Sequence, residues 1–391
     1  MASFDNPGYE QGEVIVQEPN AFAKILTLNR PQKLNVFSIE MLTRLSELFL
    51  AYENDANVKL VILKGNGRAF CAGSDVVSIA RHFYNGNRRF GATLSEKAFT
   101  MSYLSATYSK PQVSILNGIV MGAGAGVSIH GRFRVATENT VFAMPETALG
   151  SLPDVGSSYF LPRLPGFFGE YLGLTGARLD GPEMLALGLA THFVPSTKVV
   201  LLEEALVSKV GSSSSTCDVA LISSIIDEYT QRPAVKNNSA CQKMYVIDKC
   251  FSHNTVEEIF SALEEETKIN TNGDEWLNST IQSLKNASPI SLKITLRSIR
   301  EGRTQGVGES LVREYRMVCH IVQGKLSKDA AEGVRAILVD KDMNPKWEPS
   351  KLELITDQMV EHYFGKLDDD GVWKELKLPA RPNLLPENVS A

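Results

Sequence analysis

Two acidic residues stand in a segment that is otherwise apolar or small, TVFAMPETALGSLPDVGSSYFL at 140–161, and each directly follows a proline. These residues are Glu146 and Asp154. A carboxylate among apolar neighbours is partly desolvated, which raises its pKa and suits it to general base work or to attack on an activated carbonyl. The alternative is that both acids cap helices or pair with an arginine such as Arg163. The segment alone leaves both interpretations open.

Two glycine-rich turns are the second feature that could do chemistry. They are GNGRAFCAGSD at 65–75 and NGIVMGAGAG at 117–126, and each follows a predicted strand. Glycine lets the backbone turn so that N–H groups stay unpaired and point into a cleft, and a helix that begins in the second turn adds the positive end of its dipole. Either turn, taken alone, is also typical of an ordinary structural turn.

Other catalytic motifs fit this sequence less well. A dinucleotide-binding G-x-G-x-x-G loop needs a third glycine where this chain has Val127, and Glu146 lies beyond a further strand-like run at 133–137 instead of ending the next strand. The serine hydrolase elbow G-x-S-x-G fails because His130 stands where the last glycine should be. The five cysteines form no C-x-x-C pair and the six histidines have no zinc-ligand spacing, so we expect no metal site.

Strand and helix signals alternate in the N-terminal half. Short β-rich runs at 23–28, 58–64 and 111–116 are predicted strands, and Ser38 is placed to cap a helix between the first two. The apolar positions of this helix follow the 3.6-residue period and predict its core face: Met41, Leu42, Leu45, Leu48, Phe49 and Tyr52. This alternation predicts an α/β fold, with a largely parallel sheet covered by helices and ligands beyond the carboxyl ends of strands.

The C-terminal part has a different pattern. Asp180-Gly-Pro-Glu183 resembles a capping box at a helix start, and the small-residue segment GSSSST at 211–216 resembles a linker or a plain surface loop. Beyond it the pattern is mostly helical, with a capping box at 255–258 and helical periodicity at 288–300 and 307–322. We therefore expect a catalytic core over residues 1–210 and a helical region over residues 211–391 that packs on it.

Charge and composition narrow the range of partners. The net charge is −5, from 45 acidic and 40 basic side chains without a long basic run, which argues against nucleic acid. No apolar run approaches the roughly 20 residues of a membrane helix, so we expect no membrane partner. Residues 1–20 lack the features of a secretory signal or a mitochondrial presequence, and the chain does not end in Ser-Lys-Leu. These features favour a soluble intracellular protein with reduced cysteines, in the cytosol or peroxisome more than in the mitochondrion.

The two glycine-rich turns and the acidic segment, in this order and spacing, resemble the crotonase superfamily of enoyl-CoA hydratases and isomerases. Within it, the residues at 142–181, IHGRFRVATE at 129–138 and EGVRAILVDKDMNPKW at 332–347 are similar to the 3-hydroxyisobutyryl-CoA hydrolases. The similarity runs from about residue 20 to about residue 355. It implies a crotonase-type ββα spiral with a mostly helical C-terminal region.

In that superfamily, two backbone N–H groups form an oxyanion hole around the thioester oxygen. Carried over by position, the resemblance implies that the first donor is the N–H of Ser74, which lies between Gly73 and Asp75. The second donor is then the N–H of Ala123, which follows Gly122. Both residues would act through the backbone, so their side chains are only indirectly constrained.

The resemblance also implies roles for the two acids. Glu146 resembles the nucleophile or general base, and Asp154 resembles the carboxylate that binds the substrate's 3-hydroxyl and assists acid–base steps. The hydratases have an additional acid where this chain has Gly126, so hydrolysis is favoured over water addition. The implied reaction converts 3-hydroxyisobutyryl-CoA and water to 3-hydroxyisobutyrate and CoA, as in valine breakdown. It needs no cofactor, because CoA is part of the substrate.

Three positions depart from the family pattern. Ser74 and Ala123 stand where the family usually has glycine, and Ala98 stands where the hydrolases carry a carboxylate that faces the substrate pocket. A side chain at either turn narrows the room for the acyl group, and it costs about 1–2 kcal/mol if the backbone there needs a positive φ. The departures keep two alternatives open: a non-catalytic or specialised acyl-CoA-binding protein, or another crotonase reaction such as isomerisation or hydration. The resemblance also leaves open a homo-oligomer.

Overall fold

The computed structural model describes residues 12–212, 219–269, 274–368 and 373–381. They fold into two compact units, and each unit draws on three stretches of the chain. The sheet unit comprises the described residues of Met1–Gly73, Leu104–Phe142 and Leu179–Ala234, and the helical unit comprises those of Ser74–Tyr103, Ala143–Arg178 and Val235–Ala391. This division differs from a single boundary at residue 210, so the predicted domain ranges stay a prediction. Of the linker-like segment, residues 213–216 lie outside the described residues.

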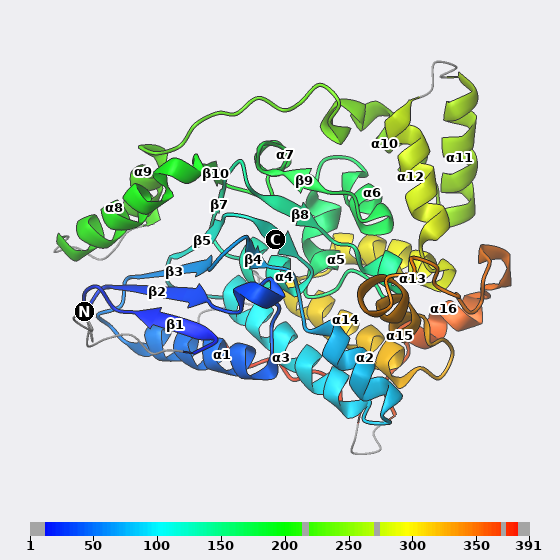
Figure 1. The fold of residues 1–391 in the computed structure, drawn as a ribbon, viewed down its shortest axis with the longest axis horizontal. Coiled ribbons are helices and arrows are strands. Elements are labelled where there is room, and N and C mark those ends of the chain that lie inside the picture. The colour runs from blue at the N-terminus through cyan, green and yellow to red at the C-terminus, as the bar shows by residue number, and fades with distance from the viewer. Residues whose placement is uncertain (1–11, 213–218, 270–273, 369–372, 382–391) are drawn as a thin grey trace. The chain divides into compact units, whose positions relative to one another are not determined.

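A six-stranded sheet is the frame of the sheet unit (Figure 1). Its strands are β1 (Val14–Gln17), β2 (Ala23–Leu28), β3 (Leu60–Gly65), β5 (Gln112–Leu116), β7 (Phe133–Ala136) and β10 (His192–Phe193), and they lie side by side in this order. Strand β1 pairs antiparallel with β2, and all the other neighbours pair in parallel. The prediction of a largely parallel sheet is therefore confirmed.

Helices cover this sheet and bury its apolar residues. All residues of β2 and β5 are buried, as expected when both faces of a parallel sheet are covered. Alternate residues such as Ile62, Val113 and Val135 form one hydrophobic cluster with Leu202 of α8 (Val199–Ser212) and Ile225 of α9 (Val219–Asp227). These two helices therefore form one layer of the sheet unit's core.

The helix predicted after Ser38 is α1 (Ile39–Asn54). The Oγ of Ser38 accepts a hydrogen bond from the backbone N–H of Met41 at 3.0 Å, which satisfies a donor that the first turn leaves unpaired. All six apolar positions predicted for the core face are buried in the structure. The cap and the core face of this helix are therefore confirmed.

A second, smaller sheet carries the glycine-rich turns. Its strands lie in the order β4 (Ala69–Cys71), β6 (Ile119–Met121), β8 (Val141–Ala143) and β9 (Leu179–Asp180). Strands β4 and β6 pair in parallel, and β8 and β9 pair antiparallel. The short helix α4 (Ala123–Ile129) follows β6, and α7 (Gly181–Ala186) follows β9 behind the predicted Asp180 capping box. Two 3-10 turns complete the sheet unit, η1 (Pro31–Lys33) and η4 (Ser196–Lys198).

The helical unit contains the remaining elements. From the first two stretches come α2 (Val76–Tyr84), α3 (Arg89–Ala106, whose residues 104–106 belong to the sheet unit), η2 (Glu146–Leu149), α5 (Ser157–Phe160), η3 (Leu161–Arg163) and α6 (Phe168–Thr175). From the third come η5 (Ala240–Lys243), α10 (Met244–Phe251), α11 (Val256–Ile269), α12 (Glu275–Asn286), α13 (Pro289–Glu301), η6 (Gly302–Thr304), α14 (Val307–Gln323), α15 (Asp329–Val334), the π-helical turn η7 (Arg335–Val339), η8 (Leu352–Leu354) and α16 (Asp357–Phe364).

The capping box predicted at 255–258 is confirmed in the helical unit, and Ser288 provides a further cap that was not predicted. Thr255 and Glu258 exchange hydrogen bonds of 3.0 and 3.2 Å at the start of α11, and the Oγ of Ser288 accepts from Ser291 N–H at the start of α13. Helices α11 and α12 lie side by side (Figure 1), and Lys285 pairs with Glu264 between them. None of the helices in the described ranges is both long and apolar enough to cross a membrane.

Gly124 is expected to be essential to the contact between α4 and β4. A Cβ at this position would lie 2.3 Å from the carbonyl oxygen of Cys71 and 2.8 Å from its Cβ. The Gly124→Ala variant should therefore lower the free energy of unfolding by about 1–3 kcal/mol, the usual cost of overpacking, in denaturant unfolding experiments. Gly308→Ala is the control, because a Cβ there would make contacts of 3.5 and 3.6 Å. Wild-type stability of Gly124→Ala would contradict the prediction.

Candidate active site

Gly73 and Gly122, one from each glycine-rich turn, lie close together in the sheet unit. Gly73, after β4, has φ +107°, and Gly122, after β6, has φ +48°. A Cβ on Gly73 would lie 3.5 Å from the carbonyl oxygen of Met121 and 3.8 Å from the backbone nitrogen of Ala123. The ends of β4 and β6 are therefore adjacent, as their parallel pairing requires.

The backbone at this point explains why Ser74 and Ala123 can replace glycine. The positive φ angles fall on the preceding residues, Gly73 and Gly122, and neither Ser74 nor Ala123 has a positive φ. The strain considered for a side chain at these positions therefore does not arise. Ala123 is also the first residue of α4, so its N–H has no carbonyl partner within the helix.

Two other predicted site residues have structural contacts. The carboxylate of Asp75 caps α2 and accepts a hydrogen bond from Ser78 N–H at 3.1 Å. Ala98 lies in α3 and is buried, and its carbonyl accepts a hydrogen bond from the Oγ of Ser102 at 3.0 Å. Asp75 therefore orders the helix that follows the first glycine-rich turn.

The acidic segment lies in the helical unit. Glu146 begins the turn η2, and its Oε2 is buried without a hydrogen-bond partner among the described residues. The alternative of pairing with Arg163 is not what the structure shows. The guanidinium of Arg163 donates to the backbone carbonyls of Tyr159, at 2.6 Å, and Gly302, at 3.1 Å. Glu146 therefore has a carboxylate oxygen shielded from water and not used by the fold, a costly state that a ligand could relieve.

A third acid, Glu314 of α14, lies with Glu146 and Asp154, and we call these three residues the acid cluster. Burial raises the pKa of Glu146 well above its ordinary value, and the charges of Asp154 and Glu314 raise it further. Burial also raises the pKa of Asp154 to about 8, with the charge of Glu314 as the second cause. Burial raises the pKa of Glu314 itself, although hydrogen bonds from Ser158 and Gly156 oppose this. The cluster therefore contains carboxyl groups that hold protons more tightly than usual.

Sequence reasoning missed Glu314, although it left a signal. The residue follows Leu311 by three positions and precedes Val318 by four, so it lies on the apolar face of the predicted helix at 307–322. Its side chain is fully buried in the structure. A charged residue on a core-facing position is rare unless it is paired, and it was therefore a candidate for the site.

Ser128, the serine of the Gly126–His130 segment, has a structural contact. Ser128 lies inside α4, and its Oγ donates a 2.8 Å hydrogen bond to the carbonyl of Gly124 instead of standing on a nucleophile elbow.

Comparison with known proteins places this chain in a family. The enoyl-CoA hydratase/isomerase family matches residues 23–364. The chain is 61% identical over 374 residues to 3-hydroxyisobutyryl-CoA hydrolase 1 of Arabidopsis thaliana, covering 96% of each chain. It is 60% identical over 381 residues to the same plant's Probable 3-hydroxyisobutyryl-CoA hydrolase 3, covering 97% of this chain and 99% of that protein.

A solved structure extends the similarity to the fold. A carnitinyl-CoA dehydratase from Mycobacterium thermoresistibile has a TM-score of 0.82 and 33% identity, covering 94% of this chain and 99% of that one. The predicted crotonase-type α/β fold is therefore confirmed. Three findings agree: the order of the glycine-rich turns and the acidic segment, the largely parallel six-stranded sheet, and these similarities. The chain therefore belongs to the enoyl-CoA hydratase/isomerase family.

Proposed function

We propose that this chain is an acyl-CoA thioester hydrolase that converts 3-hydroxyisobutyryl-CoA and water to 3-hydroxyisobutyrate and CoA. The observation that carries the proposal is the acid cluster, in which Glu146 has a buried, unpartnered oxygen and Asp154 has a pKa of about 8. The plant relatives named 3-hydroxyisobutyryl-CoA hydrolases, at 60 and 61% identity, support the choice of substrate.

Thioester hydrolysis passes through a tetrahedral intermediate whose oxygen carries negative charge. In the proposed mechanism, the backbone N–H groups of Ser74 and Ala123 bind this oxyanion. One such donor is typically worth roughly 3–4 kcal/mol of barrier, or about 100- to 1000-fold in rate. The glycines that carry the positive φ angles support this role, because they turn the chain just before each donor.

Glu146 then acts as the general base or the nucleophile. As a base it takes a proton from the attacking water, whose oxygen bonds to the carbonyl carbon and gives the tetrahedral intermediate. The carbon–sulfur bond then breaks as this intermediate collapses. As a nucleophile it forms an anhydride, which water opens in a second step. In either route the departing CoA sulfur needs a proton, and Asp154 is the proposed donor. Gly126, at the position of the hydratases' additional acid, argues against water addition to a double bond.

The acid cluster can hold an ionised and a protonated carboxyl group at the same time. Ionisation of Asp154 raises the pKa of Glu146, and the charge of Glu314 raises the pKa of both. The carboxyls therefore ionise in successive steps, so a carboxylate and a carboxylic acid coexist in the cluster over a range of pH. Base and acid are then available in the same site, and the proposed reaction uses neither a metal nor an organic cofactor.

Glu146→Gln should reduce thiol release from 3-hydroxyisobutyryl-CoA by about 100-fold or more, because the amide cannot act as base or nucleophile. The assay follows free thiol with this substrate and a panel of other short acyl-CoAs. Glu170→Gln is the control, since Glu170 is a fully buried acid of α6 that pairs with Arg303 at 2.6 Å. The hydrolase proposal would fail if the wild type released no thiol from any substrate, or if Glu146→Gln kept the wild-type rate.

Ala123→Pro should remove the second oxyanion donor without removing the helix. Proline lacks a backbone N–H but is well tolerated at the first position of a helix, where Ala123 stands. We expect kcat to fall by roughly 100- to 1000-fold while circular dichroism stays unchanged. Ala123→Gly keeps the N–H and should retain activity. Equal kcat values for the proline and glycine variants would rule out this donor.

Asp154→Asn should stabilise the protein at alkaline pH. The pKa of Asp154 is higher in the folded state than in the unfolded state, so the fold is more stable while this carboxyl is neutral. Its contribution to the free energy of unfolding is complete below the unfolded pKa of about 4 and is lost as pH rises towards about 8. The free energy of unfolding of Asp154→Asn should therefore be compared with that of the wild type at two pH values. The difference in favour of the variant should be at least about 1 kcal/mol larger at about pH 8.5 than at about pH 5, since one pKa unit equals about 1.4 kcal/mol.

The control for this measurement is Asp274→Asn. The pKa of Asp274 is lowered, first by its hydrogen bond from Lys243, so ionised Asp274 stabilises the fold above its unfolded pKa. Denaturant unfolding should show this variant less stable than the wild type at both pH values. An Asp154→Asn margin that does not grow with pH would contradict the assigned pKa direction.

A further inference from the structure

The turn that carries Asp154 is held in an unusual backbone conformation. The two residues that follow Asp154, Val155 and Gly156, have φ angles of +54° and +87°. A β-branched residue such as valine rarely adopts a positive φ, and its presence there costs free energy. Such a turn persists only where its surroundings hold it.

Glu314 supplies the contacts that hold this turn. Its Oε2 accepts a hydrogen bond from Gly156 N–H at 2.6 Å, and its Oε1 accepts one from Ser158 N–H at 2.7 Å. Both amides lie at the start of α5, where backbone donors have no partner within the helix. Because an ionised acceptor strengthens such bonds, this one carboxylate ties both ends of the Gly156–Ser158 segment to α14.

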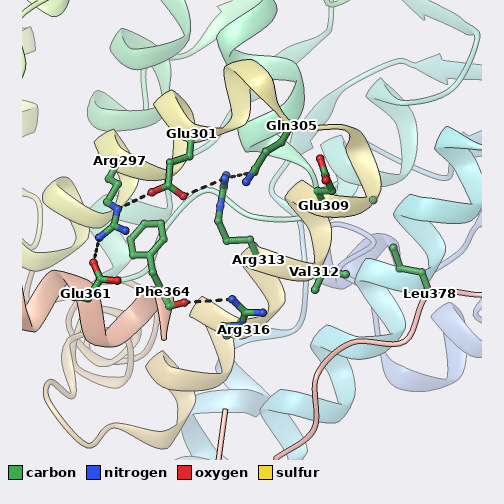
Figure 2. Close-up of a pocket in the computed structure, with 11 residues that line it drawn as sticks. Arg297, Glu301, Gln305, Glu309, Val312, Arg313, Arg316, Glu361, Phe364 and Leu378 are labelled. Carbon is green, nitrogen blue, oxygen red and sulfur yellow. Dashed lines mark hydrogen bonds and ion pairs between the residues drawn. The ribbon is translucent and has the colours of Figure 1, made fainter. Parts of the chain in front are cut away.

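The neighbouring residue Arg313 holds the same turn from another side. Its Nη2 donates to the Oγ of Ser158 at 2.8 Å and to the carbonyl of Ser298 at 2.7 Å. Figure 2 shows its guanidinium between Gln305 and Glu301, at the wall of a pocket of about 580 Å³. Ser158 is therefore bound by both members of an adjacent Arg–Glu pair, and its position depends on α14.

A capping role alone would not explain where Glu314 lies. Its carboxylate binds residues two and four positions after Asp154, and its charge acts on both Asp154 and Glu146. Burying a third negative charge beside two working acids is costly, and a neutral amide or hydroxyl could have capped a four-residue helix. The location therefore indicates that Glu314 acts on Asp154 through the turn that follows it.

We propose that Glu314 is a positioning residue for the hydrolysis: it holds the strained turn at 154–158 and thereby sets the place of the Asp154 carboxyl. The inference rests on the proposed hydrolase function. Glu314 itself does not touch the substrate in this proposal, and its effect reaches the reaction through Asp154.

The test compares Glu314→Gln and Glu314→Asp with the wild type, measuring kcat, KM and the pH profile of thiol release. In Glu314→Gln the amide NH2 faces a backbone N–H, so one bond to the turn is lost, and kcat should fall by roughly 10- to 100-fold with little change in KM. The variant also removes a charge that raises the pKa of Asp154, so the alkaline limb of the profile should move to lower pH.

Glu314→Asp separates position from charge. It keeps the negative charge but is one methylene shorter, so it cannot reach both amides. We expect kcat to fall while the alkaline limb stays in place. Glu170→Gln is the matched control, a fully buried acid in the same unit whose loss should leave both kcat and the pH profile unchanged.

The outcomes distinguish the two proposals. An inactive wild type would overturn the hydrolase function and this inference together. An active wild type, with Glu314→Gln equally active and its profile unmoved, would overturn the positioning role alone. If Glu314→Gln does not fold, as judged by circular dichroism, the aspartate variant decides: a lower kcat with an unmoved profile supports the role, and a wild-type kcat rejects it.

Discussion

Three carboxyl groups share one site, where the side chain of Glu314 is fully buried and those of Glu146 and Asp154 belong to partly buried residues. An ionised carboxylate out of water is costly, and two more beside it add repulsion. The fold offsets part of this cost through the two amides that bind Glu314 and the nearby guanidinium of Arg313. The remaining cost of ionisation is not offset at Glu146 and Asp154, so the pKa values of both are raised. The raised pKa values lower the free energy of unfolding near neutral pH, and they also allow these carboxyl groups to exchange protons in that pH range.

The sheet unit brings two backbone turns together. Strands β4 and β6 are short and parallel, so both end at the same edge and the chain must turn away twice within a small space. Gly73 and Gly122 take the positive φ angles, and Gly124 allows α4 to approach Cys71. The demands on the backbone are met by these glycines, which leaves Ser74 and Ala123 free to carry side chains without left-handed strain.

Local rules predicted those parts of the structure whose causes are local. Ser38 and the core face of α1 follow from a cap and a 3.6-residue period, and the Thr255 capping box follows from residues three apart. Strands of two or three residues, such as β8 and β9, show no period, so the small sheet could not be predicted. Its pairing depends on segments far apart in the chain.

The candidate site was predictable to a similar extent. Proline-flanked acids in an apolar segment drew attention to Glu146 and Asp154, because the segment itself shows that they are out of place. Glu314 reaches the same cluster from 160 residues beyond Asp154, and no spacing rule connects the two. Asp75 was singled out only because it lies in a glycine-rich motif. Its hydrogen bond from Ser78 N–H at the start of α2 was not predicted. Each unit is built from three separate stretches of the chain, which local sequence rules do not predict.

Infrared spectroscopy of the protein during a pH titration can show whether the acid cluster keeps a carboxylic acid at neutral pH. We expect a carboxylic acid band at pH 7 that disappears only as the pH rises to about 8 or beyond, and that is weaker in Asp154→Asn. A spectrum in which every carboxyl group is already ionised by about pH 6 would contradict it.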